Sequence, residues 1–230
     1  MEVCAAPPFA IDGTLPDDTR WRAHDLLRLR TLAQFDGEPS WVRDAFARAP
    51  FAVVRRALAA AGYVAIGIRG KERSQRYGTW AALSEMESAT SPEALLSCEP
   101  DHSRMLLPAF AALLSLRRHT PVQLETLRWG PTGSTGFELA TRVWTVTESS
   151  DLDLLIRTPA AMSHHEAAQI LQHLQAVAES TGVRVDAQLE TPAGGVALVE
   201  WAAGTTRVMA RHARGPQRVA DPWACAHGTL

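Results

Sequence analysis

The spacing of apolar residues along the chain predicts three main helices. They cover residues 39–49, 101–119 and 162–180, where apolar side chains recur at intervals of three and four. The last is the clearest, because Ser163 and Glu166 form a capping box ahead of an apolar stripe. A capping box satisfies the free N–H groups of the first turn, so this helix has a defined start.

Short segments rich in β-branched residues predict strands between the helices. They are residues 51–58, 63–70, 142–147, 151–157, 183–190, 195–201 and 207–211. Residues 122–129 fit a helix or a strand equally well. The stretch WGPTGSTGFELAT, residues 129–141, predicts a glycine-rich turn that enters a short helix.

The order of these elements divides the chain into three parts. Residues 1–20 are rich in Pro, Gly and Asp and are expected to be a loose arm. Residues 21–119 are expected to form a smaller N-terminal α/β unit. Residues 120–230 run turn-helix, strand, strand, helix, strand, strand, which predicts a mixed sheet with flanking helices and hence an α+β fold.

The composition is that of a globular protein that can bury a core, with 46% hydrophobic and 21% charged residues. A net charge of −2 creates no field that would draw the chain to nucleic acid or to a membrane, so neither is expected as a partner. The longest apolar stretch is too short to span a bilayer. The three cysteines are far apart, and the N-terminus lacks the features of a signal peptide. We therefore expect a cytoplasmic protein.

The segment SSDLDLLIR, residues 149–157, places two acidic residues in an apolar strand. Asp151 and Asp153 share one face of such a strand, with Cα atoms roughly 6.5–7 Å apart. Carboxylates about 6 Å apart repel by about 2–3 kcal/mol at an effective dielectric near 20. Solvent at the end of an edge strand, arginines, or a divalent cation such as Mg²⁺ would each relieve this repulsion.

Two other features point to the cation. Gly133 and Ser134 lie in the turn before a helix, where backbone N–H groups and the helix dipole favour an anion. Asp186 lies on a later strand and can face the aspartate pair if the two strands are neighbours, with Glu190 as the alternative third carboxylate. Three carboxylates around one point would form a site with two Mg²⁺ ions for phosphoryl transfer.

Arginines supply the candidate phosphate contacts, because their planar guanidinium groups match phosphate oxygens. Arg69 and Arg73 belong to the basic run IRGKERSQR. Arg211 ends the last predicted strand, and Arg214 follows it. A solvated basic surface is the alternative interpretation of both groups.

The turn, the Asp-x-Asp strand and the later carboxylate together resemble the nucleotidyltransferase superfamily. The longer interval between Ser134 and Asp151 is expected to hold the extra strand 142–147. Over residues 21–223 the chain resembles the bacterial malonate decarboxylase holo-acyl-carrier-protein synthases, the phosphoribosyl-dephospho-CoA transferase family. The resemblance rests on the blocks RAHDLLRL, VAIGIRGKERSQRYGTW, GPTGSTGFELAT, SSDLDLLIRTP, VDAQLETPAGGVALVEW and the closing DPW.

The resemblance implies a specific reaction. Members transfer the 2′-(5″-phosphoribosyl)-3′-dephospho-CoA group from 2′-(5″-triphosphoribosyl)-3′-dephospho-CoA to a serine of the apo acyl-carrier subunit of malonate decarboxylase, and release pyrophosphate. It implies that Asp151, Asp153 and Asp186 hold Mg²⁺, with no further organic cofactor, and that the turn Gly133–Thr135 binds phosphates. A nucleotidyltransferase that adenylylates another protein or small molecule, and a non-catalytic binding protein, are the alternatives.

Overall fold

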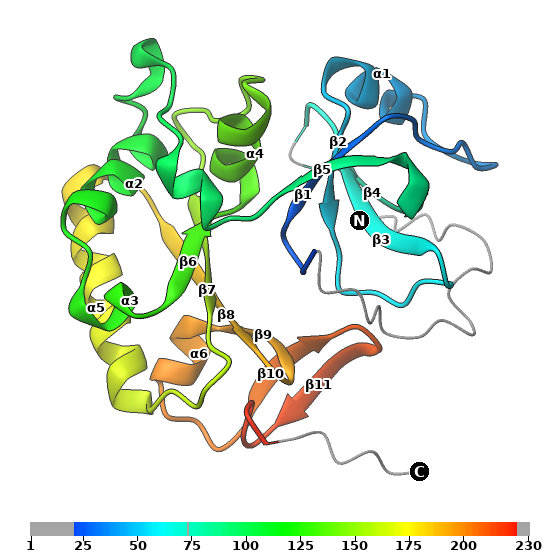
Figure 1. Cartoon of the computed structure of the whole chain (residues 1–230). Helices are drawn as coiled ribbons and strands as arrows, with labels where there is room; N and C mark the ends of the chain where they lie inside the picture. The colour runs from blue at the N-terminus through cyan, green and yellow to red at the C-terminus, as the bar shows by residue number, and fades with distance from the viewer. Residues whose placement is uncertain (1–20, 73, 225–230) are drawn as a thin grey trace. The chain divides into compact units, whose positions relative to one another are not determined.

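Two separate β-sheets organise the part of the chain that this computed structural model describes, residues 21–72 and 74–224 (Figure 1). Each sheet belongs to its own compact unit: unit 1 is Met1–Ser91 and unit 2 is Pro92–Leu230. The predicted arm 1–20 and Arg73 lie outside the described residues. The α+β class predicted from the sequence is confirmed, because both units combine helices with sheets.

Unit 1 contains an antiparallel five-stranded sheet in the order β4-β3-β2-β1-β5. Its apolar core gathers around Leu27, Val64 and Ile66, and the buried side chains Val42 and Ala45 of its helix join this core. Its elements are β1 (Leu26–Leu29), α1 (Trp41–Arg48), β2 (Phe51–Val54), β3 (Tyr63–Arg69), β4 (Arg76–Ala82), the 3-10 turn η1 (Leu83–Glu85) and β5 (Met86–Thr90).

Unit 2 contains a mixed six-stranded sheet in the order β11-β10-β9-β8-β7-β6. Strands β7 and β8 are parallel, and the other neighbours are antiparallel. Its strands are β6 (Arg128–Pro131), β7 (Leu152–Arg157), β8 (Val185–Thr191), β9 (Gly194–Ala197), β10 (Val208–His212) and β11 (Gly215–Val219). Helix α5 (His164–Thr181) connects the two parallel strands, as a parallel pair requires.

Helices lie on both sides of this sheet, with α2 and α5 on one side and α4 on the other (Figure 1). The capping box of Ser163 and Glu166 is present, and hydrogen bonds from Ser163 hold the pKa of Glu166 below its usual value. The remaining elements are the 3-10 turns η2 (Ala94–Ser97) and η3 (His102–Arg104), and the helices α2 (Pro108–Arg118), α3 (Val122–Glu125), α4 (Gly133–Thr141) and α6 (Leu198–Ala202).

The chain passes from unit 1 to unit 2 between residues 91 and 92, earlier than the expected division between 119 and 120. Helix α2 packs on α5 and β7, so it belongs to the second sheet. Residues 92–93 are also fixed there, because Glu93 forms an ion pair with Arg157 and the Pro92 carbonyl leaves no room for a Cβ atom at Gly130. Helical periodicity marks a buried face, but it does not say which sheet covers that face.

Three predicted strands are wrong in whole or in part, and the predicted strand 51–58 ends already at Val54. Residues 142–147 form no strand, because hydrogen bonds to Glu138 hold this segment in place of a strand partner. Residues 195–201 are extended only to Ala197, after which Leu198 and Trp201 are buried on the short helix α6. The ambiguous residues 122–129 contain both a helical turn, α3, and the start of β6.

Within the described ranges, no helix combines the length and the apolar composition that crossing a membrane requires.

Candidate active site

Strand β7 shows where the two aspartates of the apolar segment 149–157 lie. Leu152, Leu154 and Ile156 are fully buried on one face of the strand, and each stabilises the fold by about 1.5–3 kcal/mol relative to an exposed side chain. Asp153 alternates with them and lies half-buried on the opposite face. Asp151 directly precedes the strand and is also half-buried. The strand therefore carries its carboxylates on the face opposite Leu152, Leu154 and Ile156.

The neighbouring strand places a third aspartate beside this pair. Strand β8 runs parallel to β7, and Asp186 lies in register with Asp153. Neighbouring strands lie about 4.8 Å apart, and residues in register point to the same face. Glu190, the alternative third carboxylate, lies farther along β8 and is paired with Arg157 instead. The register therefore brings Asp186, rather than Glu190, to Asp153.

Asp186 also contacts an arginine of its own strand segment. Nε of Arg184 donates to Oδ1 of Asp186 at 3.0 Å, and Nη2 lies 2.8 Å from Oδ2. The side chains of Arg184 and Asp186 are 70% and 44% exposed, respectively. An ion pair in contact with water contributes little to stability, so this contact can be exchanged for a ligand at small cost.

The turn before α4 packs directly against Asp153. Gly133 has φ +58°, in the left-handed region that favours glycine, and a Cβ atom there would collide with Oδ2 of Asp153. The N–H of Thr132 donates to the carbonyl of Asp153 at 2.8 Å. No side chain caps this helix at Thr132. The predicted anion-binding turn and the acidic strand therefore meet at one point of unit 2.

The two hydroxyl residues that follow the glycine are buried. Ser134 is 6% exposed and Thr135 is fully buried. Oγ1 of Thr135 has no hydrogen-bond partner in the part of the chain that the structure describes. A buried hydroxyl without a partner is costly, and a ligand oxygen at the helix start would satisfy it.

Gly133→Ala is expected to lower catalytic activity by about a hundredfold, because the methyl group displaces the Asp153 carboxylate and alanine disfavours a positive φ. The backbone strain should cost about 1–2 kcal/mol of unfolding free energy. Steady-state kinetics and urea unfolding measure the two effects. Gly182→Ala is the matched control, since Gly182 also has a positive φ but open space around its Cβ position. Equal activity losses in both variants would show that strain alone is responsible.

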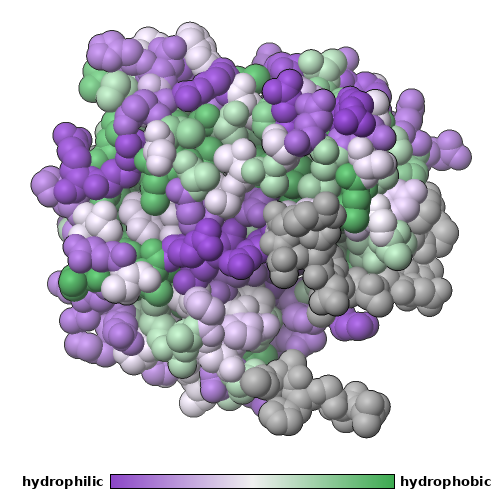
Figure 2. Space-filling model, viewed as in Figure 1, coloured by the Kyte–Doolittle hydropathy of each residue, from purple (hydrophilic) through white to green (hydrophobic). Residues whose placement is uncertain are grey.

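Arginine and amide side chains lie on the same face of the sheet as Asp186. Gln188 and Glu190 follow Asp186 on the same face of β8, and Nη1 of Arg211 on β10 donates to Oε1 of Gln188 at 2.9 Å. Arg214 lies exposed in the turn between β10 and β11. Figure 2 shows hydrophilic surface gathered over the central strands of this sheet. Arg211 is thus linked to the strand that carries Asp186.

The predicted contacts from the basic run do not belong to this unit. Arg69 ends β3 in unit 1, paired with Arg76, and Arg73 lies outside the described residues. Arg69 therefore belongs to the other unit, and the phosphate contacts of Arg69 and Arg73 stay a prediction.

The donor set of the site suits Mg²⁺, although the three aspartates do not form a closed ligand cluster. Within residues 21–72 and 74–224, no group of three or more His, Cys, Asp and Glu side chains is arranged to hold a metal ion. Mg²⁺ usually takes one or two protein carboxylates and completes its shell with water and substrate phosphates. Asp153 and its neighbours Asp151 and Asp186 meet that requirement.

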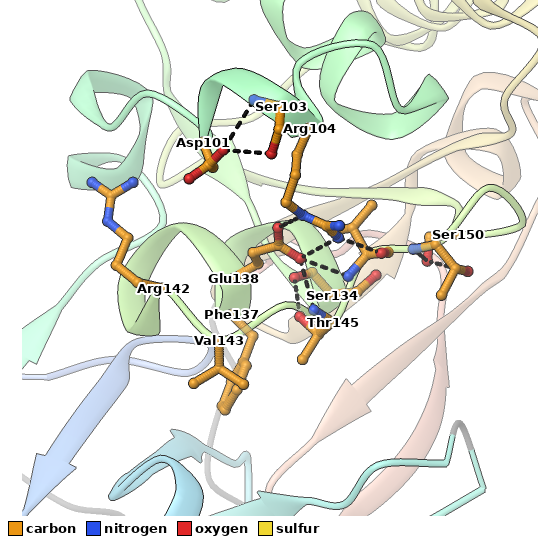
Figure 3. Close-up of polar contacts among 12 residues, drawn as sticks. Asp101, Ser103, Arg104, Ser134, Phe137, Glu138, Arg142, Val143, Thr145 and Ser150 are labelled. Carbon is orange, nitrogen blue, oxygen red and sulfur yellow. Dashed lines mark hydrogen bonds and ion pairs between the residues drawn. The ribbon is translucent and has the colours of Figure 1, made fainter.

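Glu138 fixes the segment that joins helix α4 to strand β7 (Figure 3). It lies on α4, accepts N–H groups from Thr145 and Val146 at 2.7 Å, and forms an ion pair with Arg104. Arg104 also donates to the carbonyl of Val146 at 2.6 Å. The side chains of Arg104 and Glu138 are only 13% and 6% exposed, respectively. This network was not predicted, although a glutamate between buried Phe137 and Leu139 was a usable signal.

A short capped turn presents Arg104 to this network. Asp101 caps η3, accepting the N–H of Ser103 at 2.9 Å and its hydroxyl at 2.6 Å. These hydrogen bonds lower the pKa of Asp101, so it stays ionised. Figure 3 shows Arg104 reaching Glu138 from this turn, on the side of α4 that faces Thr145.

Comparisons with known proteins agree with this architecture. The family model "Phosphoribosyl-dephospho-CoA transferase MdcG C-terminal domain" matches residues 96–222, and the model of the N-terminal domain of the same family matches residues 22–92. The first matched range ends at residue 92, next to the division between unit 1 and unit 2, and the second begins at residue 96. No solved structure matches the chain.

Curated bacterial relatives match over almost their whole length. A Pseudomonas aeruginosa protein is 44% identical over 204 residues, which cover 88% of this chain and 94% of the relative. A Pseudomonas putida protein is 42% identical over 205 residues, covering 88% and 95%. An Azotobacter vinelandii protein is 38% identical over 209 residues, covering 87% and 93%. Each of these relatives is named phosphoribosyl-dephospho-CoA transferase.

Proposed function

Because the chain belongs to the phosphoribosyl-dephospho-CoA transferase family, we propose that it attaches a CoA-derived prosthetic group to a carrier protein. The donor is 2′-(5″-triphosphoribosyl)-3′-dephospho-CoA. The acceptor is a serine of the apo acyl-carrier subunit of malonate decarboxylase, and the leaving group is pyrophosphate.

The observation that carries this proposal is the contact between Gly133 and the Asp153 carboxylate. It joins a helix start, which favours phosphate oxygens, to an acidic strand, which favours a cation. Phosphoryl transfer from a triphosphate needs both, because catalysis depends mainly on positioning and on stabilising charge.

The residues of unit 2 then have separate roles. The N–H groups of Gly133, Ser134 and Thr135 and the hydroxyls of Ser134 and Thr135 hold the β- and γ-phosphates. Arg211 and Arg214 offer guanidinium groups to the same charge from β10 and the turn that follows it. Asp151, Asp153 and Asp186 hold Mg²⁺, which when bound supplies positive charge against the triphosphate and the leaving pyrophosphate.

The reaction exchanges one phosphorus–oxygen bond for another. The carrier serine Oγ forms a bond to the α-phosphorus while the bond from that phosphorus to the bridging oxygen of the pyrophosphate breaks. The serine proton passes to solvent, which reaches this face because the Asp186 side chain is 44% exposed. The product is a phosphodiester between the carrier serine and the phosphoribosyl group.

The test is intact-mass spectrometry of the apo carrier subunit after incubation with the full chain, Mg²⁺ and the triphosphoribosyl donor. We expect a mass gain of one phosphoribosyl-dephospho-CoA group, release of pyrophosphate, and loss of both with EDTA. Glu179→Gln, an exposed change on α5, is the control and should transfer normally.

Two other outcomes would contradict the proposal. A mass gain with ATP, but none with the CoA-derived donor, would identify an adenylyltransferase. No mass gain with either donor would refute the proposed activity, although the fold and the family membership would still hold.

A further inference from the structure

Trp144 is unusual among the tryptophans of this chain. All seven tryptophans lie within the described residues, and the other six are buried or half-buried. Trp144 is 65% exposed. Aromatic side chains dominate contact surfaces, because they present a large, flat, rigid area to a ligand. An isolated exposed tryptophan next to a candidate active site is therefore a candidate binding residue.

The backbone that follows Trp144 is held firmly. The N–H groups of Thr145 and Val146 both donate to the buried carboxylate of Glu138, and the carbonyl of Val146 accepts from Arg104. The Val146 side chain is buried as well. The exposure of Trp144 is therefore not the exposure of a loose loop.

One face of the indole ring is already covered. The guanidinium carbon of Arg104 lies 4.6 Å from the centroid of the ring. Ion pairing with Glu138 holds that guanidinium in place. A cation on one ring face, together with an exposed fraction of 65%, leaves the opposite face accessible to a flat partner. A ring fixed in advance loses little conformational freedom when a ligand stacks on it.

Trp144 also lies beside the anion-binding turn. The hydroxyl of Thr145, the next residue, donates to the carbonyl of Ser134 at 3.1 Å. Figure 3 shows Thr145 and Ser134 side by side near Glu138. The segment that carries Trp144 is therefore bonded directly to the helix that begins with the turn at Gly133–Thr135.

We propose that Trp144 is the stacking platform for the adenine base of the donor. This inference rests on the proposed function, in which the donor carries a triphosphate at one end and adenine two ribose rings away. The triphosphate occupies the helix start, and the purine lies on the open face of the indole ring. Stacking recognises the flat surface of the base. The chain thereby binds the CoA-derived part of the donor independently of its phosphates.

The experiment measures binding of 3′-dephospho-CoA to the full chain by calorimetry, with 4′-phosphopantetheine, which lacks adenine, as the control ligand. Trp144→Leu is expected to raise the dissociation constant for 3′-dephospho-CoA about tenfold or more, whereas Trp144→Phe should stay within about threefold. Neither change should alter binding of 4′-phosphopantetheine. Leu106→Ala, at the most exposed large apolar residue of the described chain, is the matched control and should bind as the wild type does.

Kinetics separate adenine binding from carrier docking. The KM for the donor should rise in Trp144→Leu, while the KM for the apo carrier stays unchanged. An unchanged dissociation constant for 3′-dephospho-CoA, or a rise confined to the KM for the carrier, overturns the proposal. The calorimetry needs no turnover, so a wild-type chain that binds 3′-dephospho-CoA but transfers nothing would refute the proposed function without refuting the role of Trp144.

Discussion

Asp153→Asn is expected to reduce transfer to the carrier about a thousandfold or more while leaving the protein folded. Asparagine has nearly the volume of aspartate, so the packing against Gly133 persists. The negative charge beside the helix start is lost, and with it one of the carboxylates proposed to bind Mg²⁺. Single-turnover kinetics with saturating donor measure the loss, and circular dichroism checks the fold.

Two neighbouring carboxylates make this prediction specific. Asp186→Asn should also lower activity strongly, because Asp186 is in register with Asp153. Glu190→Gln changes a residue of the same strand and the same face. Glu190 lies in register with Arg157 and not with Asp153, so this change should lower activity only slightly. Wild-type activity in Asp153→Asn would refute the acidic site, and a larger loss in Glu190→Gln than in Asp186→Asn would mean that the third carboxylate was assigned wrongly.

The elements with strong periodicity could be predicted from the sequence. Strand β7, helix α5 with its capping box, and strand β10 all lie where the apolar pattern puts them. Alternation along β7 also predicted which face carries the aspartates. These features are local, since the spacing of residues in one segment decides them.

Long-range contacts account for what the sequence did not reveal. Residues 142–147 have the composition of a strand, but the buried carboxylate of Glu138 takes their N–H groups and no neighbouring strand pairs with them. Helix α2 has an ordinary apolar stripe, and only its packing on α5 assigns it to unit 2. A single segment contains no information about such partners.

In the candidate site, too, the local features could be predicted from the sequence and the long-range contacts could not. The glycine turn and the Asp-x-Asp strand could be identified from residue types, and the structure brings Gly133 and Asp153 into contact. The ion pair between Asp186 and Arg184 was not anticipated, although the two residues are two apart on one extended segment and therefore share a face. Arg104 was missed because its partner Glu138 lies 34 residues away.

Breaking the ion pair between Arg104 and Glu138 is expected to have the largest effect on stability. Glu138→Gln leaves a mostly buried guanidinium without its countercharge, which costs about 3–5 kcal/mol of unfolding free energy. Arg104→Met should cost a similar amount, because the Glu138 carboxylate then stays buried with only the N–H groups of Thr145 and Val146. Urea unfolding gives both values, and hydrogen exchange at Val146 reports whether the segment itself has loosened.

The double variant distinguishes a coupled pair from two independent residues. Arg104→Met with Glu138→Gln leaves no unpaired buried charge, so its loss should fall below the sum of the single losses by about 2 kcal/mol or more. Glu99→Gln removes an ion pair with Arg117 that is more exposed to water, and it should change stability by less than about 0.5 kcal/mol. Strictly additive losses would refute the coupling. If the pair is coupled, the single variants should also weaken donor binding, because the same guanidinium orients Trp144 and the same carboxylate holds the backbone beside it.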